Sequence, residues 1–591
     1  MTKSDAGAVL FFLWAFCSLA YSVNRGLTEK ALSWLAISIA SYLLARLLAR
    51  DDSLSILRKI LIWAACGTVL YEVMTGIFQG NGGTPIIFST FYNKNIYGGF
   101  LASLLPLIFL GERRPGMTEL ALEVIYGAII IAGLYQTFSR GAWLIAAGTL
   151  LVLAILNVLR REYWVTGIII MMVTIGMATG YCVDHVVNQN AITRWAANEK
   201  ATAVETRSIS PRLAYWKNAV KIGLSSPLLG SGHGTFAATH TRVAHWPVYS
   251  KYAHNYFLQT FAELGLVGLI AFTFAVLAPC FTWMKNLPFK TEAERRFPFY
   301  LAALVLLAHA CLDITLDVPE GALWFWLLLG IGCPRNVPHT GREAGKQRWL
   351  WVGAYALGLL LLILVGVLQW RQSRIDRLAR AVAASTNTED RIGLLSEALR
   401  VRPYDAELLA ERALYYRKAG LFQHALADYR AAAKADRNRP GYQLGEAYTL
   451  LLMGRKEEAR RKAGQALAIN PTLPDILEGA GMVLLSTGRR HEGISAIAAS
   501  ILIQGKTTII PAARARELLE VSLEMEPGDS GRLHLALAMI ESELGNYQRA
   551  SQLLTFGKAT SGVERTAYLK LVSVLSAKGY KVEGMDETVE K

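Results

Sequence analysis

The first 370 residues of this chain form a succession of apolar runs separated by short polar stretches. A helix crosses the hydrocarbon core of a membrane with roughly 20 mostly apolar residues, and most of these runs approach that length. We therefore predict an all-α membrane bundle of about 11–12 transmembrane helices. The runs lie at about residues 8–23, 31–49, 55–79, 96–111, 119–138, 142–159, 163–181, 255–284, 297–317, 321–334 and 349–370.

The composition of the whole chain agrees with a membrane protein. Apolar residues make up 53% of the 591 positions and charged residues 18%, which is too apolar for a soluble protein of this size. Charge is concentrated in residues 385–591, so we expect a polar C-terminal domain after the membrane body. The run at 8–23 has the position of a signal peptide. No small-x-small cleavage site closes it and many spans follow, which favours an uncleaved first helix.

Lysine and arginine residues gather in alternate loops of the membrane half. Because basic loops stay in the cytoplasm, the alternation predicts a cytoplasmic N-terminus and places residues 182–254 and the C-terminal domain on the extracytoplasmic side. The same topology explains the net charge of +15 better than a nucleic-acid partner does. The cytoplasmic cations would be Arg46, Arg50, Arg58, Lys59, Arg113, Arg114, Arg160, Arg161, Lys285, Lys290, Arg295, Arg296, Arg335, Arg342, Lys346 and Arg348.

Residues 388–591 contain an internal repeat. Its glycines recur at a spacing of 34 residues, at Gly420, Gly454 and Gly488 and again at Gly545 and Gly579. Small residues at fixed offsets from these glycines allow two helices to pack closely. The period resembles that of the tetratricopeptide repeat, whose helix pairs stack into an α-solenoid. A break in phase at 505–526 indicates a divergent repeat or an insertion.

The repeat array has two possible roles. It is either a structural scaffold or a concave surface that holds a protein partner, and neither role implies catalysis. We expect residues 372–387 to be the linker that joins it to the membrane domain of residues 1–371.

The extracytoplasmic segment at 182–254 is long for a connection in a membrane protein, and long loops are often functional. Its five histidines lack the spacing of a metal-binding helix, and the six cysteines of the chain form no ligand pattern, so neither a metal site nor a disulfide framework is expected. His254 stands where the next apolar run begins. A neutral imidazole there would either take a proton from a sugar hydroxyl or cap the helix, and the loop alone does not separate these roles.

Other polar groups mark the predicted outer face. Arg140, in TFSRGAW, has no basic neighbours; it would bind a phosphate through its planar guanidinium or reach lipid head groups. Asn93 and Asn95 would hydrogen-bond a sugar or cap the next helix. The glycines at 230, 232 and 234 favour a flexible turn over a phosphate cradle, because no strand or nucleotide-binding helix flanks them.

Four segments, in this order, resemble the superfamily of O-antigen ligases and Wzy-type polymerases. They are NKNIYGGFLASLLPL from residue 93, TFSRGAWL from residue 137, the block through Arg212, Trp216, Pro227, Gly230, Gly232 and Phe236, and AHNYFLQTFAELGLVGLIAF from residue 253. The resemblance covers about residues 55–335. The order of the motifs and their placement on the outer side make the set specific. His233 departs from the pattern, which has a small or aliphatic residue at that place.

The resemblance implies a membrane glycosyltransferase of the GT-C type in the bacterial cytoplasmic (inner) membrane. Such an enzyme moves a glycan from an undecaprenyl-diphosphate carrier to an acceptor hydroxyl on the extracytoplasmic face, with no metal, nucleotide sugar or other cofactor. By the match, Arg140 and Arg212 would bind the diphosphate and His254 would activate the acceptor. The substrate-binding residues would be Asn93, Asn95, Trp216, Gly232, Asn255 and Glu263, the last about two helical turns after His254.

Three other functions compete with a ligase. A Wzy-type polymerase would use the same donor and join lipid-linked repeat units, whereas the fused repeat domain favours a ligase with a lipid, protein or glycan acceptor. A transporter of lipid-linked sugars would need ionisable residues in mid-span and an internal duplication; His309, Asp313 and Asp317 lie near one span, but no duplication is found. A non-catalytic anchor for the repeats would not need Arg140, Arg212 and His254 on one side.

Overall fold

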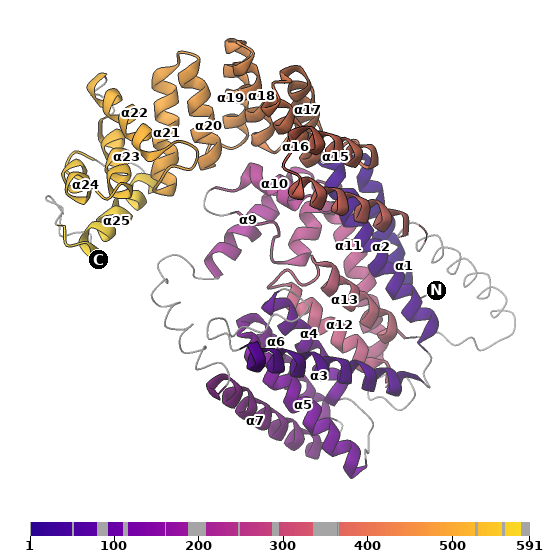
Figure 1. Ribbon diagram of the computed structural model, residues 1–591. Coiled ribbons are helices and arrows are strands. Elements are labelled where there is room, and N and C mark those ends of the chain that lie inside the picture. Colours follow the sequence, from indigo (N-terminus) through magenta and orange to yellow (C-terminus); the bar gives the residue numbers. More distant parts are fainter. Residues whose placement is uncertain are drawn as a thin grey trace. The chain divides into compact units, whose positions relative to one another are not determined.

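The chain divides into two compact units in the computed structural model (Figure 1). Unit 1 comprises Met1–Ser22, Leu27–Phe236 and Ser250–Trp370, and unit 2 comprises Val23–Gly26, Ala237–Tyr249 and Arg371–Lys591. Throughout the described residues the regular elements are helices, which confirms the all-α fold class. The structure describes residues 2–49, 53–79, 93–109, 116–159, 161–186, 209–245, 249–285, 295–334, 363, 366–525, 530–557 and 562–580.

Unit 1 is a bundle of apolar helices. Seven helical segments in the described part of the chain are long and apolar enough to cross a membrane, which confirms a polytopic membrane domain. The span predicted at 349–370 lies outside the described residues, except for 363 and 366–370. The helices are α1 (Lys3–Cys17), η1 (Ser18–Ala20), α2 (Arg25–Leu48), α3 (Leu54–Gln79), α4 (Lys94–Phe109), α5 (Met117–Thr137), α6 (Arg140–Leu159), α7 (Tyr163–Val186), α9 (Ile209–Ser225), α10 (Phe236–Val243), α11 (Tyr256–Lys285), α12 (Phe297–Ala310) and α13 (Pro319–Gly332).

Glycines allow the helices of this bundle to approach closely. A Cβ atom on Gly176 of α7 would lie 2.7 Å from the Cβ of Ile131 in α5, and one on Gly7 of α1 would lie 2.7 Å from the backbone of Ala275 in α11. Such contacts leave no room for a side chain. Small residues commonly bring membrane helices together in this way, since lipid supplies no hydrophobic drive for helices to associate.

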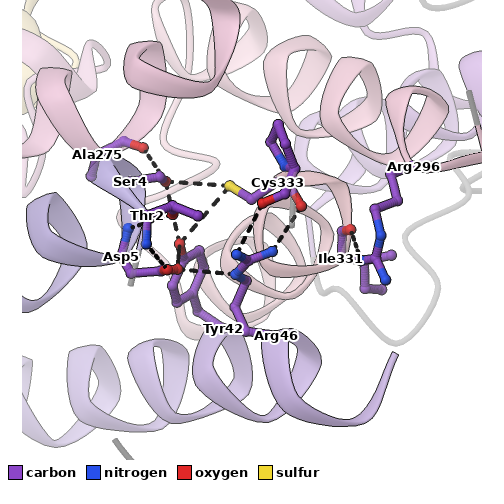
Figure 2. A network of polar contacts seen from close by, with 10 residues as sticks. Thr2, Ser4, Asp5, Tyr42, Arg46, Ala275, Arg296, Ile331 and Cys333 are labelled. Carbon is purple, nitrogen blue, oxygen red and sulfur yellow. Dashed lines mark hydrogen bonds and ion pairs between the residues drawn. The ribbon is translucent and has the colours of Figure 1, made fainter. Parts of the chain in front are cut away.

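A buried polar network joins α1, α2 and the end of α13 (Figure 2). The Arg46 guanidinium lies 3.0 Å from the Asp5 carboxylate and donates to the carbonyl oxygens of Cys333 and Pro334 at 2.7 and 3.0 Å. The Tyr42 hydroxyl donates to the same carboxylate at 2.7 Å. The ion pair therefore satisfies carbonyls at the end of α13 that have no partner within their own helix.

A second arginine closes two more helix ends. Arg296 donates to the carbonyl of Ile331 in α13 at 2.8 Å and to that of Ala49, just after α2, at 2.7 Å (Figure 2). Arg46 and Arg296 served above only as cytoplasmic topology signals. The structure buries both side chains, so they are also structural caps.

Unit 2 contains a solenoid of helix pairs, as the 34-residue period predicts. The repeat glycines end helices in the left-handed conformation, for example Gly420 with φ of +77° and Gly454 with φ of +75°, where a side chain would be strained. The helices are α15 (Thr388–Val401), α16 (Ala406–Lys418), α17 (Phe422–Ala435), α18 (Pro440–Leu452), α19 (Lys456–Ile469), α20 (Pro474–Ser486), α21 (Arg490–Gln504), α22 (Ala512–Met525), α23 (Ser530–Glu543), α24 (Tyr547–Leu554) and α25 (Gly562–Ala577).

The break in repeat phase has a visible cause. The buried Glu478 carboxylate accepts hydrogen bonds from the backbone amides of Thr508 and Ile509 at 2.9 and 2.8 Å. These bonds hold an inserted loop between α21 and α22, and the next helix pair starts late. The range 372–387, expected as a linker, is helical as far as residue 384.

We predict that Asp5→Ala destabilises unit 1 strongly, because it leaves the Arg46 charge buried without its carboxylate. The loss should be about 3–5 kcal/mol in the free energy of unfolding, seen as a lower melting temperature of the detergent-solubilised protein. The control is Glu119→Ala, which removes the exposed partner of Lys59 and should leave the melting temperature unchanged. Equal melting temperatures for the two variants would contradict the role given to the buried pair.

Candidate active site

The turn between α12 and α13 carries a buried carboxylate that gathers polar groups from three other parts of unit 1. Asp313 Oδ2 accepts hydrogen bonds from Arg212 of α9 at 2.8 Å and from Asn95 of α4 at 2.9 Å. Asp313 Oδ1 accepts the backbone amide of Ile314 at 2.8 Å and lies 3.7 Å from His254 Nδ1, an ion-pair rather than a hydrogen-bond distance. Asp313 is thus the centre of the site.

His254 is held in an unusual conformation beside this carboxylate. Its φ of +54° lies in the left-handed region, which costs energy for any residue other than glycine. Its ring stacks on the Tyr215 ring, with centroids 5.6 Å apart and 23° between planes. The Trp216 indole donates to the His254 carbonyl at 3.4 Å. Neighbours from α9 therefore fix both the backbone and the ring of this histidine.

Asn255 ties the start of α11 to the same turn. Its side-chain amide donates to the Cys311 carbonyl at 3.1 Å, and its oxygen accepts the Leu258 amide at 3.1 Å, which caps α11. The next residue after His254 thus has a clear structural function. Placing the imidazole near Asp313 depends on this tie.

The segments NKNIYGGF and TFSRGAW pack against each other and against α12. A Cβ atom on Gly98 would lie 2.6 Å from the Ala142 Cβ, and one on Gly99 would lie 2.8 Å from His309 Nδ1. Gly141, next to Arg140, faces the other nitrogen of the same ring, since a Cβ there would lie 3.8 Å from His309 Nε2. The Arg140 side chain is exposed at the first residue of α6.

Two of the predicted sugar contacts have helix-end roles. Asn93 Oδ1 accepts the Asn95 amide at 2.8 Å, which is the capping function that was the alternative for this residue. Asn95, in contrast, turns its side-chain amide to Asp313. The structure therefore brings Asn95, Arg212, Trp216, His254 and Asn255 together, and leaves Asn93 at the cap of α4.

The predicted glycine turn is packed against a break in α11. Gly265 has φ of +64° and ψ of −167°, so the helix stops its regular hydrogen bonding there. The carbonyl of Glu263 accepts the Gly232 amide at 2.8 Å, and the Leu266 amide donates to the Pro227 carbonyl at 2.8 Å. The turn thus supplies the hydrogen bonds that the broken helix lacks.

Glu263 binds this turn through its side chain as well. Its carboxylate accepts the backbone amides of Gly234 at 2.7 Å and Phe236 at 3.1 Å, and its Oε2 lies 3.4 Å from His233 Nδ1. His233, the departure from the family pattern, therefore has an acidic neighbour. Gly232 packs on Ser22, since a Cβ atom there would lie 2.5 Å from the Ser22 hydroxyl oxygen. These contacts give Glu263 and Gly232 roles in holding the turn.

Two carboxyl groups in the 311–318 turn have opposite charge preferences. Burial alone would raise the pKa of Asp313, but its neighbours, the His254 ring first, outweigh burial and lower that pKa. Burial raises the pKa of Asp317 well above its usual range, and the negative charges of Glu263 and Asp313 add to the rise. Both Asp317 oxygens are buried and accept no hydrogen bond from the residues that the structure describes. Asp313 is thus an anion and Asp317 a neutral acid near pH 7.

The sequence analysis missed Asp313 as a site residue and considered it only for a transporter. The available signal was an acidic residue at the outer end of an apolar run, where an unpaired charge is costly. Within the described part of the chain, no group of three or more histidine, cysteine, aspartate or glutamate side chains is arranged to hold a metal ion.

Residues 125–273 match the family described as O-antigen ligase. The matched range includes Arg140, Arg212 and His254 and ends before Asp313. The comparison with curated proteins found no match.

Several solved structures align with parts of the chain. A crystal structure of MamA is 16% identical and aligns with 33% of this chain and 92% of its own, with a TM-score of 0.20. A tetratricopeptide repeat protein from Parabacteroides merdae is 16% identical and aligns with 36% and 95%, with a TM-score of 0.20. Yeast Tom70 is 10% identical over 82% and 89%, with a TM-score of 0.21.

The raised pKa of Asp317 predicts a pH-dependent stability. A carboxyl whose pKa is higher in the folded than in the unfolded protein stabilises the fold at low pH, and this contribution is lost as pH rises through the folded pKa. Asp317→Asn keeps the shape and stays neutral. We expect its melting temperature to exceed that of the unmodified protein by several degrees at pH 9, with a smaller difference at pH 5. A difference that does not grow with pH would contradict a buried neutral acid.

Proposed function

We propose that this chain, a member of the O-antigen ligase family with a C-terminal tetratricopeptide repeat domain, transfers a glycan from an undecaprenyl-diphosphate carrier to an acceptor hydroxyl on the extracytoplasmic face of the bacterial inner membrane. The observation that carries the proposal is the Asp313 carboxylate, which binds Arg212 directly and lies beside the His254 ring. It unites a proton acceptor and a phosphate-binding cation, the two groups that this transfer needs.

His254 is the proposed general base. A carboxylate beside Nδ1 orients the ring and stabilises the imidazolium that forms when the ring takes a proton. Nε2 then accepts the proton of the acceptor hydroxyl while its oxygen attacks the anomeric carbon of the donor. The bond from that carbon to the diphosphate oxygen breaks, and the diphosphate leaves on its lipid with the negative charge.

Arg212 and Arg140 are the proposed diphosphate-binding residues. Arg212 uses one Nη2 hydrogen bond on Asp313, and its guanidinium has further N–H donors for phosphate oxygens. Arg140 stands at the first turn of α6, exposed, beside the glycine that packs near His309. Positive charge at the leaving diphosphate stabilises the transition state, where that charge develops. Asn95 and Trp216 support the cluster through Asp313 and the His254 backbone.

The transporter alternative fits the positions of the acids less well. Asp313 and Asp317 lie in the turn after α12 and not within a span, and Asp313 is engaged by Arg212 and Asn95. A polymerase remains an alternative because it would use the same donor and the same base. The acceptor decides between ligase and polymerase, and the repeat domain favours a dedicated acceptor or protein partner.

We predict that His254→Ala and Arg140→Ala abolish transfer in proteoliposomes that contain undecaprenyl-diphosphate glycan and candidate acceptors. Loss of the base should lower the rate by about 10²–10⁴-fold, and loss of a phosphate contact by about 10²–10³-fold. Matched controls are His424→Ala in α17 and Arg161→Ala beyond the far end of α6, which should keep full rates. Full activity in the two site variants would remove the assignment, and elongated lipid-linked glycan without another acceptor would indicate a polymerase.

Two neighbouring acids should respond differently to the same change. Asp313→Asn removes the charge that pairs with Arg212 and orients His254, so we expect kcat to fall by about 10²-fold or more. Asp317→Asn replaces a neutral acid with a neutral amide and should keep transfer within about threefold, since no charge changes. Equal losses in the two variants would show that Asp313 has no special relation to His254.

The orientation is open to a separate test. Single cysteines introduced at positions 140 and 254 of a variant without the native cysteines should react with a membrane-impermeant maleimide added from the extracytoplasmic side. Labelling only after the membrane is opened would place the site in the cytoplasm and contradict the proposal.

A further inference from the structure

Unit 2 includes two short segments that come from far outside the repeats. Val23–Gly26 precedes most of α2, and Ala237–Tyr249 contains most of α10, yet both belong to the same compact unit as Arg371–Lys591. The second segment follows the glycine turn directly in the chain and ends five residues before His254 (254 − 249). The repeat helices therefore fold together with pieces of the extracytoplasmic connections.

Asn470 holds the C-terminal end of α10. Its side-chain amide donates to the carbonyl oxygens of Thr241 and Ala244 at 2.5 and 3.0 Å. The last carbonyls of a helix have no partner within the helix, so an amide here satisfies groups that would otherwise need water. The Asn470 oxygen accepts the Thr472 amide at 2.9 Å, which fixes which way the side chain faces.

Asp436 holds the other segment in the same manner. One carboxylate oxygen accepts the Asn24 side-chain amide at 3.0 Å, and the other accepts the Asn438 backbone amide at 3.1 Å. Asp436 and Asn470 are 34 residues apart (470 − 436), and each is the residue that ends the second helix of a pair, α17 and α19. Both are almost fully buried. One position of the repeat thus binds a different foreign segment in two successive repeats.

The loop one repeat earlier adds to the first contact. The Arg25 guanidinium lies 5.8 Å from the centre of the Tyr404 ring. A Cβ atom on Gly26 would lie 3.6 Å from the Cα of Asp405, so the two backbones are in close contact. Both residues lie in the connection between α15 and α16. Contacts to Val23–Gly26 therefore extend over the loops of two repeats.

We propose that the loops after α15, α17 and α19 form an intramolecular docking surface whose occupants are Val23–Gly26 and Ala237–Tyr249 of the same chain. The alternative, that Asp436 and Asn470 only shape their own turns, accounts for one side-chain atom of each residue. The other atom is bonded to the foreign segment. A protein partner of the repeats would therefore bind a surface other than these loops.

The proposal predicts that α10 depends on the repeats for its structure. An isolated helix of eight residues is unstable in water, so α10 needs its end contacts. Asn470→Asp keeps the oxygen that accepts Thr472 but replaces the amide donor with an acceptor facing two carbonyls. The matched control is Gln504→Glu, the same chemical change one repeat later (470 + 34).

Hydrogen exchange of the full chain in detergent, read by mass spectrometry, tests this. We expect Asn470→Asp to speed exchange in peptides from 237–245 by roughly tenfold and Gln504→Glu to leave them unchanged. Unchanged exchange in Asn470→Asp, or equal acceleration in both variants, would overturn the proposal.

A second variant tests the surface without altering the repeats. Asn24→Ala removes the donor to Asp436 from outside the solenoid, so misfolding of the repeats cannot explain its effect. We expect faster exchange in peptides that cover 23–26, with no change in the helices after α20. Unaltered exchange at 23–26 would show that Asp436 does not hold this segment.

Discussion

Backbone hydrogen bonding within an apolar bundle is the constraint on which the site depends. Unpaired amides and carbonyls are costly in lipid, and a helix can break only where other groups replace its lost bonds. At Gly265 the break in α11 is satisfied by the glycine turn that begins at Pro227. The turn needs left-handed glycines to approach this closely, and the Glu263 carboxylate secures it. His254 and Asn255, at the start of α11, take their positions from this arrangement.

The charge state of the site follows from neighbours more than from burial. Asp313 and Asp317 are four residues apart in one turn, and both are removed from water. Asp313 has a cation and hydrogen-bond donors, whereas the Asp317 carboxylate has no bonded partner among the described residues. One is therefore an anion that can orient an imidazole, and the other is a neutral acid. Desolvation acts on both, and only specific partners separate them.

The repeat domain gains a meaning that a generic scaffold would not have. Its period and its buried small residues explain why helix pairs stack, and they say nothing of what the loops between pairs bind. Asp436 and Asn470 show that equivalent loop positions can hold different segments through the same geometry. Ala237–Tyr249 lies between the glycine turn and His254 in the chain, so a repeat that holds it also limits the freedom of the site's connections.

The sequence by itself determined the membrane bundle, the solenoid and most of the residues that gather at the site. Apolar run length, the 34-residue period and short motifs are local properties, and local backbone preference and burial express them directly. Only the tertiary structure decided that Asp313 is the centre of the cluster, that Glu263 holds a turn, that Asn93 caps a helix, and that Arg46 and Arg296 are buried caps. These roles depend on which atoms from distant segments meet, and in a single sequence a buried, paired charge looks the same as a solvated one.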